Sequence, residues 1–136
     1  RIKMPKQFTY RGKTVEEIMK MDLNQYMELV PSRQRRTLKR NIAKAYKPLL
    51  EKIRKARQGS YKKPIKTHAR DMVIIPDMIG TTIHIHSGKL FTPILITEEM
   101  LGHYLGEFAL TRTKVKHSAP GIGATKSSTA IASKAK

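Results

Sequence analysis

Apolar residues recur at helical spacing near the start of the chain. The segment Thr14-Val15-Glu16-Glu17 has the pattern of a capping box, in which a Thr hydroxyl and a Glu carboxylate accept hydrogen bonds from free backbone donors. The pattern predicts a first short helix from Val15. Asp22 can cap a second helix, which ends at Pro31.

Two further helices are predicted downstream. The first begins at Ser32 and runs to about Arg40. The second shows the clearest period, because its apolar residues follow the i, i+3, i+4, i+7 rule. These residues are Tyr46, Leu49, Leu50 and Ile53. Gly59 suits the end of this helix, and residues 59–66 have no apolar period, which is typical of a linker.

The pattern changes from helical to strand-like after residue 70. Residues 72–75 form a short apolar run, and residues 83–86 alternate between apolar and polar. Residues 91–96 resume as a strand after a tight turn at Ser87-Gly88, so we expect one strand plus a hairpin. Thr97 can cap a last helix. Its apolar face would carry Leu101, Tyr104, Leu105 and Phe108.

These elements predict an α+β protein. We expect a small three-stranded sheet, made of one strand and a hairpin, packed with a C-terminal helix and preceded by an N-terminal helical extension. Residues 117–132 are rich in Gly, Ala, Ser and Thr, a composition that cannot bury enough surface to order alone. The expected parts are a basic helical extension (1–58), an α+β body (59–112) and a flexible basic tail (113–136).

Charge narrows the choice of partner. The 136 residues include 28 Lys and Arg against 10 Asp and Glu, a formal net charge of +18. Residues 31–70 carry 15 of these basic side chains and only Glu51 against them. A surplus of this size favours a polyanion, with nucleic acid ahead of an anionic membrane surface.

Composition also excludes several classes. The chain has no Cys, which rules out disulfide scaffolds, thiolate metal sites and thiol nucleophiles. Its apolar runs are far shorter than the roughly 20 residues that span a bilayer. The chain also has no phosphate-cradling Gly loop followed by Lys and no Asp/Glu cluster with metal spacing. We therefore expect a soluble, intracellular protein that is not an enzyme, has no cofactor and takes no small-molecule substrate.

Two basic stretches are candidates for binding phosphate. The third predicted helix crowds its cations into two turns, although like charges at i, i+4 destabilise a helix. These cations are Arg33, Arg35, Arg36, Lys39 and Arg40. The second stretch, residues 62–70, is extended by Pro64, so that alternate side chains can reach phosphates on either side. Its candidates are Lys62, Lys63, Lys66, His68 and Arg70.

Histidines leave an alternative open. His84 and His86 project to one face of a predicted strand, and His103 and Glu107 lie at i, i+4 in the last predicted helix. These four side chains could hold a metal ion, although they match no specific zinc motif. We favour histidines that face RNA, where imidazoles stack and form hydrogen bonds.

Three motifs resemble a known family. They are Lys63-Pro64-Ile65-Lys66-Thr67, Ile75-Pro76-Asp77-Met78-Ile79-Gly80, and residues 97–109 with Gly-His-x-Leu-Gly-Glu-Phe at their centre. Together they resemble the universal ribosomal protein nineteen of the small subunit, and the last motif is highly specific. The Arg33-Gln34-Arg35-Arg36 helix and residues 117–128 are similar to the archaeal and eukaryotic branch, whose eukaryotic member is numbered fifteen.

The resemblance implies a structural constituent of the ribosome. Proteins of this kind lie in the head of the small subunit, bind its ribosomal RNA and adjoin ribosomal protein thirteen. The expected location is therefore the cytoplasm, within the small ribosomal subunit. Their C-terminal tail approaches the decoding region and transfer RNA. By resemblance, Thr67 also follows the RNA backbone and His103 and Arg112 lie near RNA. Lys89 is a further candidate for RNA binding in the α+β body. The tail's charge is carried by Lys114, Lys116 and Lys126, which are also candidates for RNA binding.

A DNA-architectural or helix-turn-helix protein is the other alternative. It would use the same basic helices. The gap from Asn41 to Ala45 counts against it, because it is longer than the usual turn of three or four residues.

Overall fold

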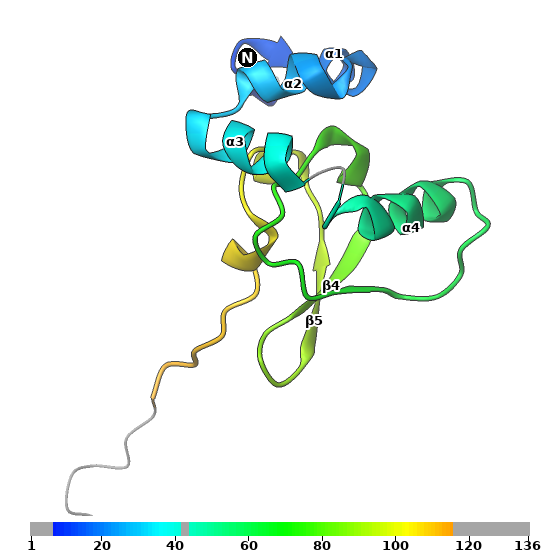
Figure 1. Cartoon of the computed structure of the whole chain (residues 1–136), viewed down its shortest axis with the longest axis vertical. Helices are drawn as coiled ribbons and strands as arrows, with labels where there is room; N and C mark the ends of the chain where they lie inside the picture. Colours follow the sequence, from blue (N-terminus) through cyan, green and yellow to red (C-terminus); the bar gives the residue numbers. More distant parts are fainter. Residues whose placement is uncertain (1–6, 42–43, 116–136) are drawn as a thin grey trace, which may run out of the picture.

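The computed structural model describes residues 7–41 and 44–115, and it confirms the α+β class (Figure 1). Four helices and a three-stranded sheet form its main elements, with a small N-terminal hairpin and three short 3₁₀ turns. Within these residues, no helix combines the length and the apolar character needed to cross a bilayer.

The N-terminal part begins with a hairpin that the sequence pattern did not reveal. Strands β1 (Thr9–Tyr10) and β2 (Lys13–Thr14) pair antiparallel. Helix α1 (Val15–Lys20) follows directly, and its capping box is present: the Glu17 N–H donates to the Thr14 hydroxyl, and the Thr14 N–H donates to Glu17. Helix α2 (Leu23–Leu29) starts after Asp22, although the Asp22 side chain makes no capping hydrogen bond.

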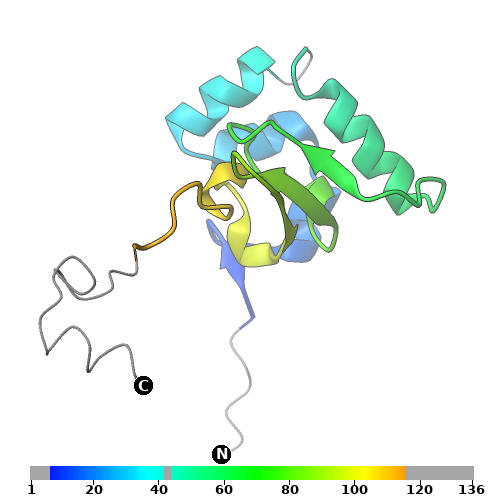
Figure 2. The ribbon, with the colours of Figure 1, turned by 90° about the horizontal axis from the view of Figure 1, so that it is seen from below.

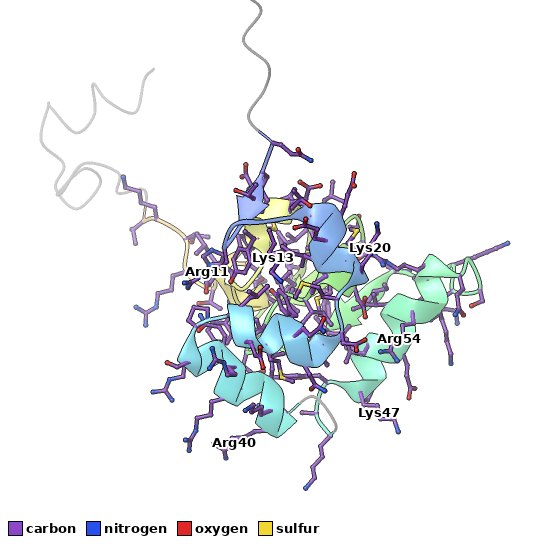
Figure 3. The ribbon with its side chains drawn as sticks, turned by 90° about the horizontal axis from the view of Figure 1, so that it is seen from above. Arg11, Lys13, Lys20, Arg40, Lys47 and Arg54 are labelled. Atoms are coloured by element: carbon purple, nitrogen blue, oxygen red, sulfur yellow. The ribbon has the colours of Figure 1, made fainter. Side chains whose placement is uncertain are left out.

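The two basic helices form as expected. Helix α3 spans Ser32–Asn41 and helix α4 spans Lys47–Arg57. Each buries one face: Leu38 on α3, and Leu49, Leu50 and Ile53 on α4. Figures 2 and 3 show both helices on the same side of the molecule. Their buried faces therefore direct the remaining, mostly basic side chains outward.

The sheet has the predicted make-up but a different first strand. Strands β3 (Ile65–Thr67), β4 (Thr82–His86) and β5 (Phe91–Leu95) lie in the order β3-β4-β5. β3 pairs parallel with β4, and β4 pairs antiparallel with β5. The prediction of a strand at residues 72–75 and a linker through residue 66 was therefore wrong. The apolar run is fully buried, but it pairs with residues 102–105 instead of joining the sheet.

The predicted C-terminal helix does not form, and this prediction was wrong. Two 3₁₀ turns, η2 (Glu98–Met100) and η3 (Leu105–Glu107), stand in its place. Gly102 separates them with a φ of 77°, a left-handed conformation that interrupts a helix. The backbone groups here bond to residues 70–74 instead: Ile74 donates to the His103 carbonyl and Leu105 donates to the Met72 carbonyl. A long-range ladder thus replaces local helical bonds.

One hydrophobic core joins all these elements. It includes Ile18 of α1, Tyr26 of α2, Leu38 of α3, Ile53 of α4 and Ile83 of β4. Residues on both sides of position 58 contribute to it, so the helices pack on the sheet and on the buried run at residues 72–75. The core fixes where the basic helices lie relative to the sheet. The predicted disordered tail falls mainly on residues 116–136, outside the described part of the chain.

Candidate nucleic-acid interface

Helix α3 presents a surface made of cations. Arg33, Arg36, Lys39 and Arg40 are exposed and line a common recess along the helix, which contains no acidic residue. Figure 3 shows Arg40 pointing away from the body of the protein. A row of unpaired cations spaced along a helix is the electrostatic footprint expected of a phosphate-binding surface.

Helix α4 extends this surface with residues that the sequence reading did not single out. The additional exposed cations are Lys47, Lys52, Arg54, Lys55 and Arg57. Their helical spacing was the missed signal, because a helix that buries Leu49, Leu50 and Ile53 directs its other side chains outward. The Arg57 guanidinium, although exposed, also donates to the Ile79 carbonyl at 3.2 Å. Lys47 and Arg54 both project outward in Figure 3. We call these nine exposed side chains of α3 and α4 the cationic helix face.

Almost nothing on the protein neutralises these charges. In residues 7–41 and 44–115, the one ion pair joins His103 and Glu107, whose Nδ1 and Oε2 atoms are 2.8 Å apart. None of the Lys and Arg side chains described there has a carboxylate within salt-bridge distance. Mutual repulsion on this scale favours an anionic partner.

Arg35 differs from its neighbours on α3. Its guanidinium turns back onto the end of α2, where Nε donates to the Met27 carbonyl at 2.8 Å and Nη2 donates to the Glu28 and Val30 carbonyls. It therefore satisfies carbonyls that the end of α2 leaves without partners. Arg35, predicted to bind RNA, is placed by the structure as a support for the helix pair.

Arg70 has a similar internal role. Its guanidinium donates to the carbonyls of His86, at 2.6 Å, of Gly106, at 2.8 Å, and of Ala109. It thereby ties the end of β4 to the chain around η3. A Cβ on Gly106 would lie 2.9 Å from the Arg70 carbonyl oxygen, so only glycine allows this approach.

Thr67 is also internal. Its side chain is only 7% exposed, and its hydroxyl accepts a hydrogen bond from the Ala69 N–H at 3.0 Å. The Thr67 hydroxyl thus shapes the chain after β3, and its contact with RNA stays a prediction.

The outer surface of the sheet forms a second candidate surface. Cross-strand partners share a face, and the register pairs Lys66 with His84, His84 with Pro93, and His86 with Phe91. Ile83 and Ile85 alternate with the histidines and are buried on the opposite side. We call Lys66, His68, His84, His86, Phe91 and Pro93 the sheet face. The strands and hairpin that form it contain no acidic residue.

The remaining candidates are spread around these surfaces. Lys62 and Lys63 are exposed before β3, Lys89 is exposed in the loop between β4 and β5, and Arg112 and Lys114 are exposed after the core ends. Lys116 and Lys126 lie outside the described residues.

Within the described residues, His84, His86 and His103 are not gathered at one metal site. His84 and His86 lie on β4, whereas His103 pairs with Glu107 between η2 and η3. Among the residues that the structure describes, no group of three or more His, Cys, Asp or Glu side chains could hold a metal ion. The Glu107 carboxylate also accepts from the Tyr104 N–H at 3.1 Å, which gives it a local structural role.

Two buried tyrosines connect the layers. The Tyr26 hydroxyl donates to the Ile74 carbonyl at 2.9 Å, and burial raises the pKa of Tyr26 well above its ordinary value. The Tyr46 hydroxyl lies 2.8 Å from a carboxylate oxygen of Asp71 and accepts from the Asn41 amide. Burial, opposed by the Asn41 hydrogen bond and reinforced by Asp71, raises the pKa of Tyr46 to about 12.

A cationic helix face whose Lys and Arg side chains make no ion pair, although α4 also carries Glu51, and a sheet face without acidic residues are typical of proteins that bind a polyanion. Comparison with known proteins identifies its kind. Residues 36–117 match the family described as Ribosomal protein S19. The chain is also 48% identical, over 130 residues, to the small ribosomal subunit protein uS19 of Saccharolobus solfataricus, covering 95% of this chain and 93% of that protein.

The chain therefore belongs to the ribosomal protein S19 family, in its archaeal and eukaryotic type. Members are structural constituents of the small ribosomal subunit that bind ribosomal RNA, rather than enzymes. Membership favours RNA over the DNA-binding alternative that the basic helices left open.

Proposed function

We propose that this protein occupies the head of the small ribosomal subunit, where the cationic helix face binds phosphates of folded small-subunit ribosomal RNA. The observation that carries this proposal is the absence, among described residues, of any carboxylate paired with a Lys or Arg. Cations bound to phosphate displace condensed counterions, so binding is expected to weaken steeply with salt. Recognition is mainly of shape, because duplex RNA hides its base edges in a deep, narrow major groove.

A different surface suits a protein neighbour, which we propose to be ribosomal protein thirteen. Glu98 and Glu99 border a recess that is otherwise largely apolar and includes Phe8 and Leu95. Leu95 is 57% exposed. Carboxylates beside apolar side chains repel phosphate but suit a basic protein, which supports a protein contact here.

The tail, residues 113–136, is proposed to extend toward the decoding region and transfer RNA. Its support is the family resemblance, together with the exposed positions of Arg112 and Lys114 where the chain leaves the core. The cytoplasm, as the site of the assembled ribosome, is the corresponding location.

Single-cysteine variants test this placement directly, because the natural chain contains no Cys. One variant is Arg40→Cys, on the cationic helix face, and the other is Glu99→Cys, at the border of the recess that includes Phe8 and Leu95. Each would carry a tethered iron chelate in reconstituted small subunits. Hydroxyl radicals from position 40 are expected to cleave ribosomal RNA of the head. Position 99 is expected to cleave RNA weakly and to cross-link to protein thirteen when it carries a short cross-linker.

Two results would contradict the proposal. The first is RNA cleavage confined to the subunit body from position 40. The second is binding of the purified chain to ribosomal RNA of the head that does not weaken as salt is raised.

A further inference from the structure

Three aromatic rings meet at one corner of the sheet face. His68 follows β3, His86 ends β4 and Phe91 begins β5. The ring centroids of His68 and His86 are 4.3 Å apart with an interplanar angle of 37°. Phe91 meets both rings edge to face, with centroids 5.2 Å from His68 and 4.9 Å from His86. The rings therefore form one continuous group drawn from three parts of the chain.

The backbone that carries these rings is held from several sides. Arg70 donates to the His86 carbonyl, and the Gly88 N–H donates to Nδ1 of the His86 ring at 3.3 Å. The buried Thr67 hydroxyl accepts from Ala69 and so shapes the turn that carries His68. Because the cluster is assembled before any ligand arrives, little conformational entropy remains to be lost on binding.

The cluster is open to a ligand. His68 is exposed, while His86 and Phe91 are only partly buried. The His68 ring is tilted against His86 and meets Phe91 edge to face, and these contacts leave the His68 residue exposed. A flat ligand could continue the stack there, since aromatic groups pair favourably in offset arrangements.

The surroundings indicate the charge of that ligand. The Lys66 ammonium lies 5.3 Å from the centre of the Phe91 ring, and Lys89 is exposed in the adjoining loop. No acidic residue occurs in residues 60–70 or 82–95, which supply the cluster and its borders. Aromatic rings beside unpaired cations suit a nucleotide, in which a flat base is joined to a phosphate. Proteins bind single-stranded nucleic acid in this way, with bases stacked on rings and phosphates beside cations.

We propose that His68, His86 and Phe91 form a stacking site for one unpaired RNA base, with Lys66 placed to bind an adjacent phosphate. This rests on the proposed function and deepens it: the cationic helix face binds phosphates, whereas this site selects a nucleotide that is not in a duplex. Every base has a flat face, so the site is expected to tolerate any of the four.

Two probes of equal charge test the site on the full-length chain. One is single-stranded hexauridylate, and the other is the same ribose-phosphate hexamer without bases. His68→Ala should weaken binding of hexauridylate by about tenfold, within the roughly 5- to 150-fold range known for loss of a stacked base, and leave the abasic hexamer unaffected. His68→Phe should restore binding. Thr82→Ala, at an exposed position at the start of β4 and away from the ring cluster, is the matched control and should bind like wild type.

Proton NMR locates the contact independently of affinity. Ring protons of His68 should shift upfield on addition of hexauridylate, those of the buried Tyr26 should not, and the abasic hexamer should shift neither. Equal losses of both hexamers in His68→Ala, or failure of His68→Phe to restore binding, would overturn the stacking site. Wild-type chain that binds both hexamers equally would overturn this site alone. Wild-type chain that binds neither hexamer would also overturn the site, whereas the proposed function fails only if the chain does not bind folded small-subunit ribosomal RNA.

Discussion

The cationic helix face and the sheet face differ in what they can distinguish. The first holds nine exposed cations on α3 and α4 and no aromatic ring. The second holds three clustered rings and the single cation Lys66. Point charges attract any polyanion of suitable shape, whereas rings accept only a base that has left its stack. In our two proposals, affinity for RNA and selection of unpaired bases therefore belong to different surfaces of one small fold.

Each surface also has an arginine beside it that faces inward. Arg35, on α3, donates to carbonyls at the end of α2, and Arg70 donates to carbonyls that join β4 to the chain around η3. The sequence alone predicts the same phosphate-binding role for Arg35 and Arg70 as for the exposed cations next to them. The structure separates them by what their guanidinium groups contact, and variants can test that separation.

The largest effect is expected from Arg70→Ala. The change removes the charged donor from three carbonyls and should lower the free energy of unfolding by about 3 kcal/mol, because hydrogen bonds to charged groups are strong and buried acceptors left unpaired are costly. Urea denaturation followed by circular dichroism measures it. Lys66→Ala, an exposed cation nearby, is the control and should unfold like wild type. Equal stability of the two variants would remove the distinction between inward and outward cations beside the sheet.

Next in size is the combined variant Arg33→Ala, Arg36→Ala and Arg40→Ala. If each side chain neutralises one phosphate, the log–log salt slope should fall by about 2 to 3, and affinity near 0.1 M salt should drop roughly 100-fold. Filter binding to small-subunit ribosomal RNA over a salt series measures both. The denaturation midpoint should not fall, since the removed side chains are exposed. An unchanged slope would show that this face is not in contact with RNA.

Local patterns predicted some of these features well. The capping box at Thr14 and the apolar periods of α2 and α4 depend on residues within a few positions of one another, and all three helices formed as expected. The hairpin of β4 and β5 follows the same logic, because alternation and a short connection act locally. The excess of cations was equally visible, since charge is a property of composition.

Long-range pairing accounts for what the sequence could not provide. Residues 97–109 carry a helix-like apolar pattern, yet their backbone bonds go to residues 70–74, and Gly102 turns the chain between two 3₁₀ segments. The first strand was assigned to residues 72–75 instead of 65–67 because a buried run and a sheet strand look alike in one dimension. The ring cluster depends on the parallel register of β3 with β4, which also has no local signal.

A smaller effect separates Arg35 from its neighbours on α3. Arg35→Ala should lower the free energy of unfolding by about 1–2 kcal/mol, because it leaves carbonyls at the end of α2 without their donor. Arg33→Ala is the matched control on the same helix and should change stability little. RNA affinity should show the reverse order. Thermal melts measure the stability of both variants, and filter binding measures their RNA affinity. If the two variants changed equally in stability and in affinity, Arg35 and Arg33 would not have different roles.

The smallest effect at neutral pH concerns Tyr46, which links the two surfaces by joining Asn41 at the end of α3 to Asp71 beyond β3. Burial raises the pKa of Tyr46 from its ordinary 10.0 to about 12 in the folded protein. Between pH 10 and 12 the unfolded chain therefore loses this proton while the folded chain keeps it. The stability that depends on the protonated hydroxyl is complete below pH 10 and falls as the pH rises toward 12.

Tyr46→Phe should make this alkaline decline shallower, in denaturation midpoints measured from pH 9 to 11.5, although it also removes a hydrogen bond at every pH. Some decline should remain, because burial raises the pKa of Tyr26 as well. Tyr61→Phe, at a half-buried position, serves as the control and should leave the slope unchanged. A slope in Tyr46→Phe as steep as in wild type would mean that the hydroxyl is not enclosed between α3 and Asp71. The helix face and the sheet face would then lack this link.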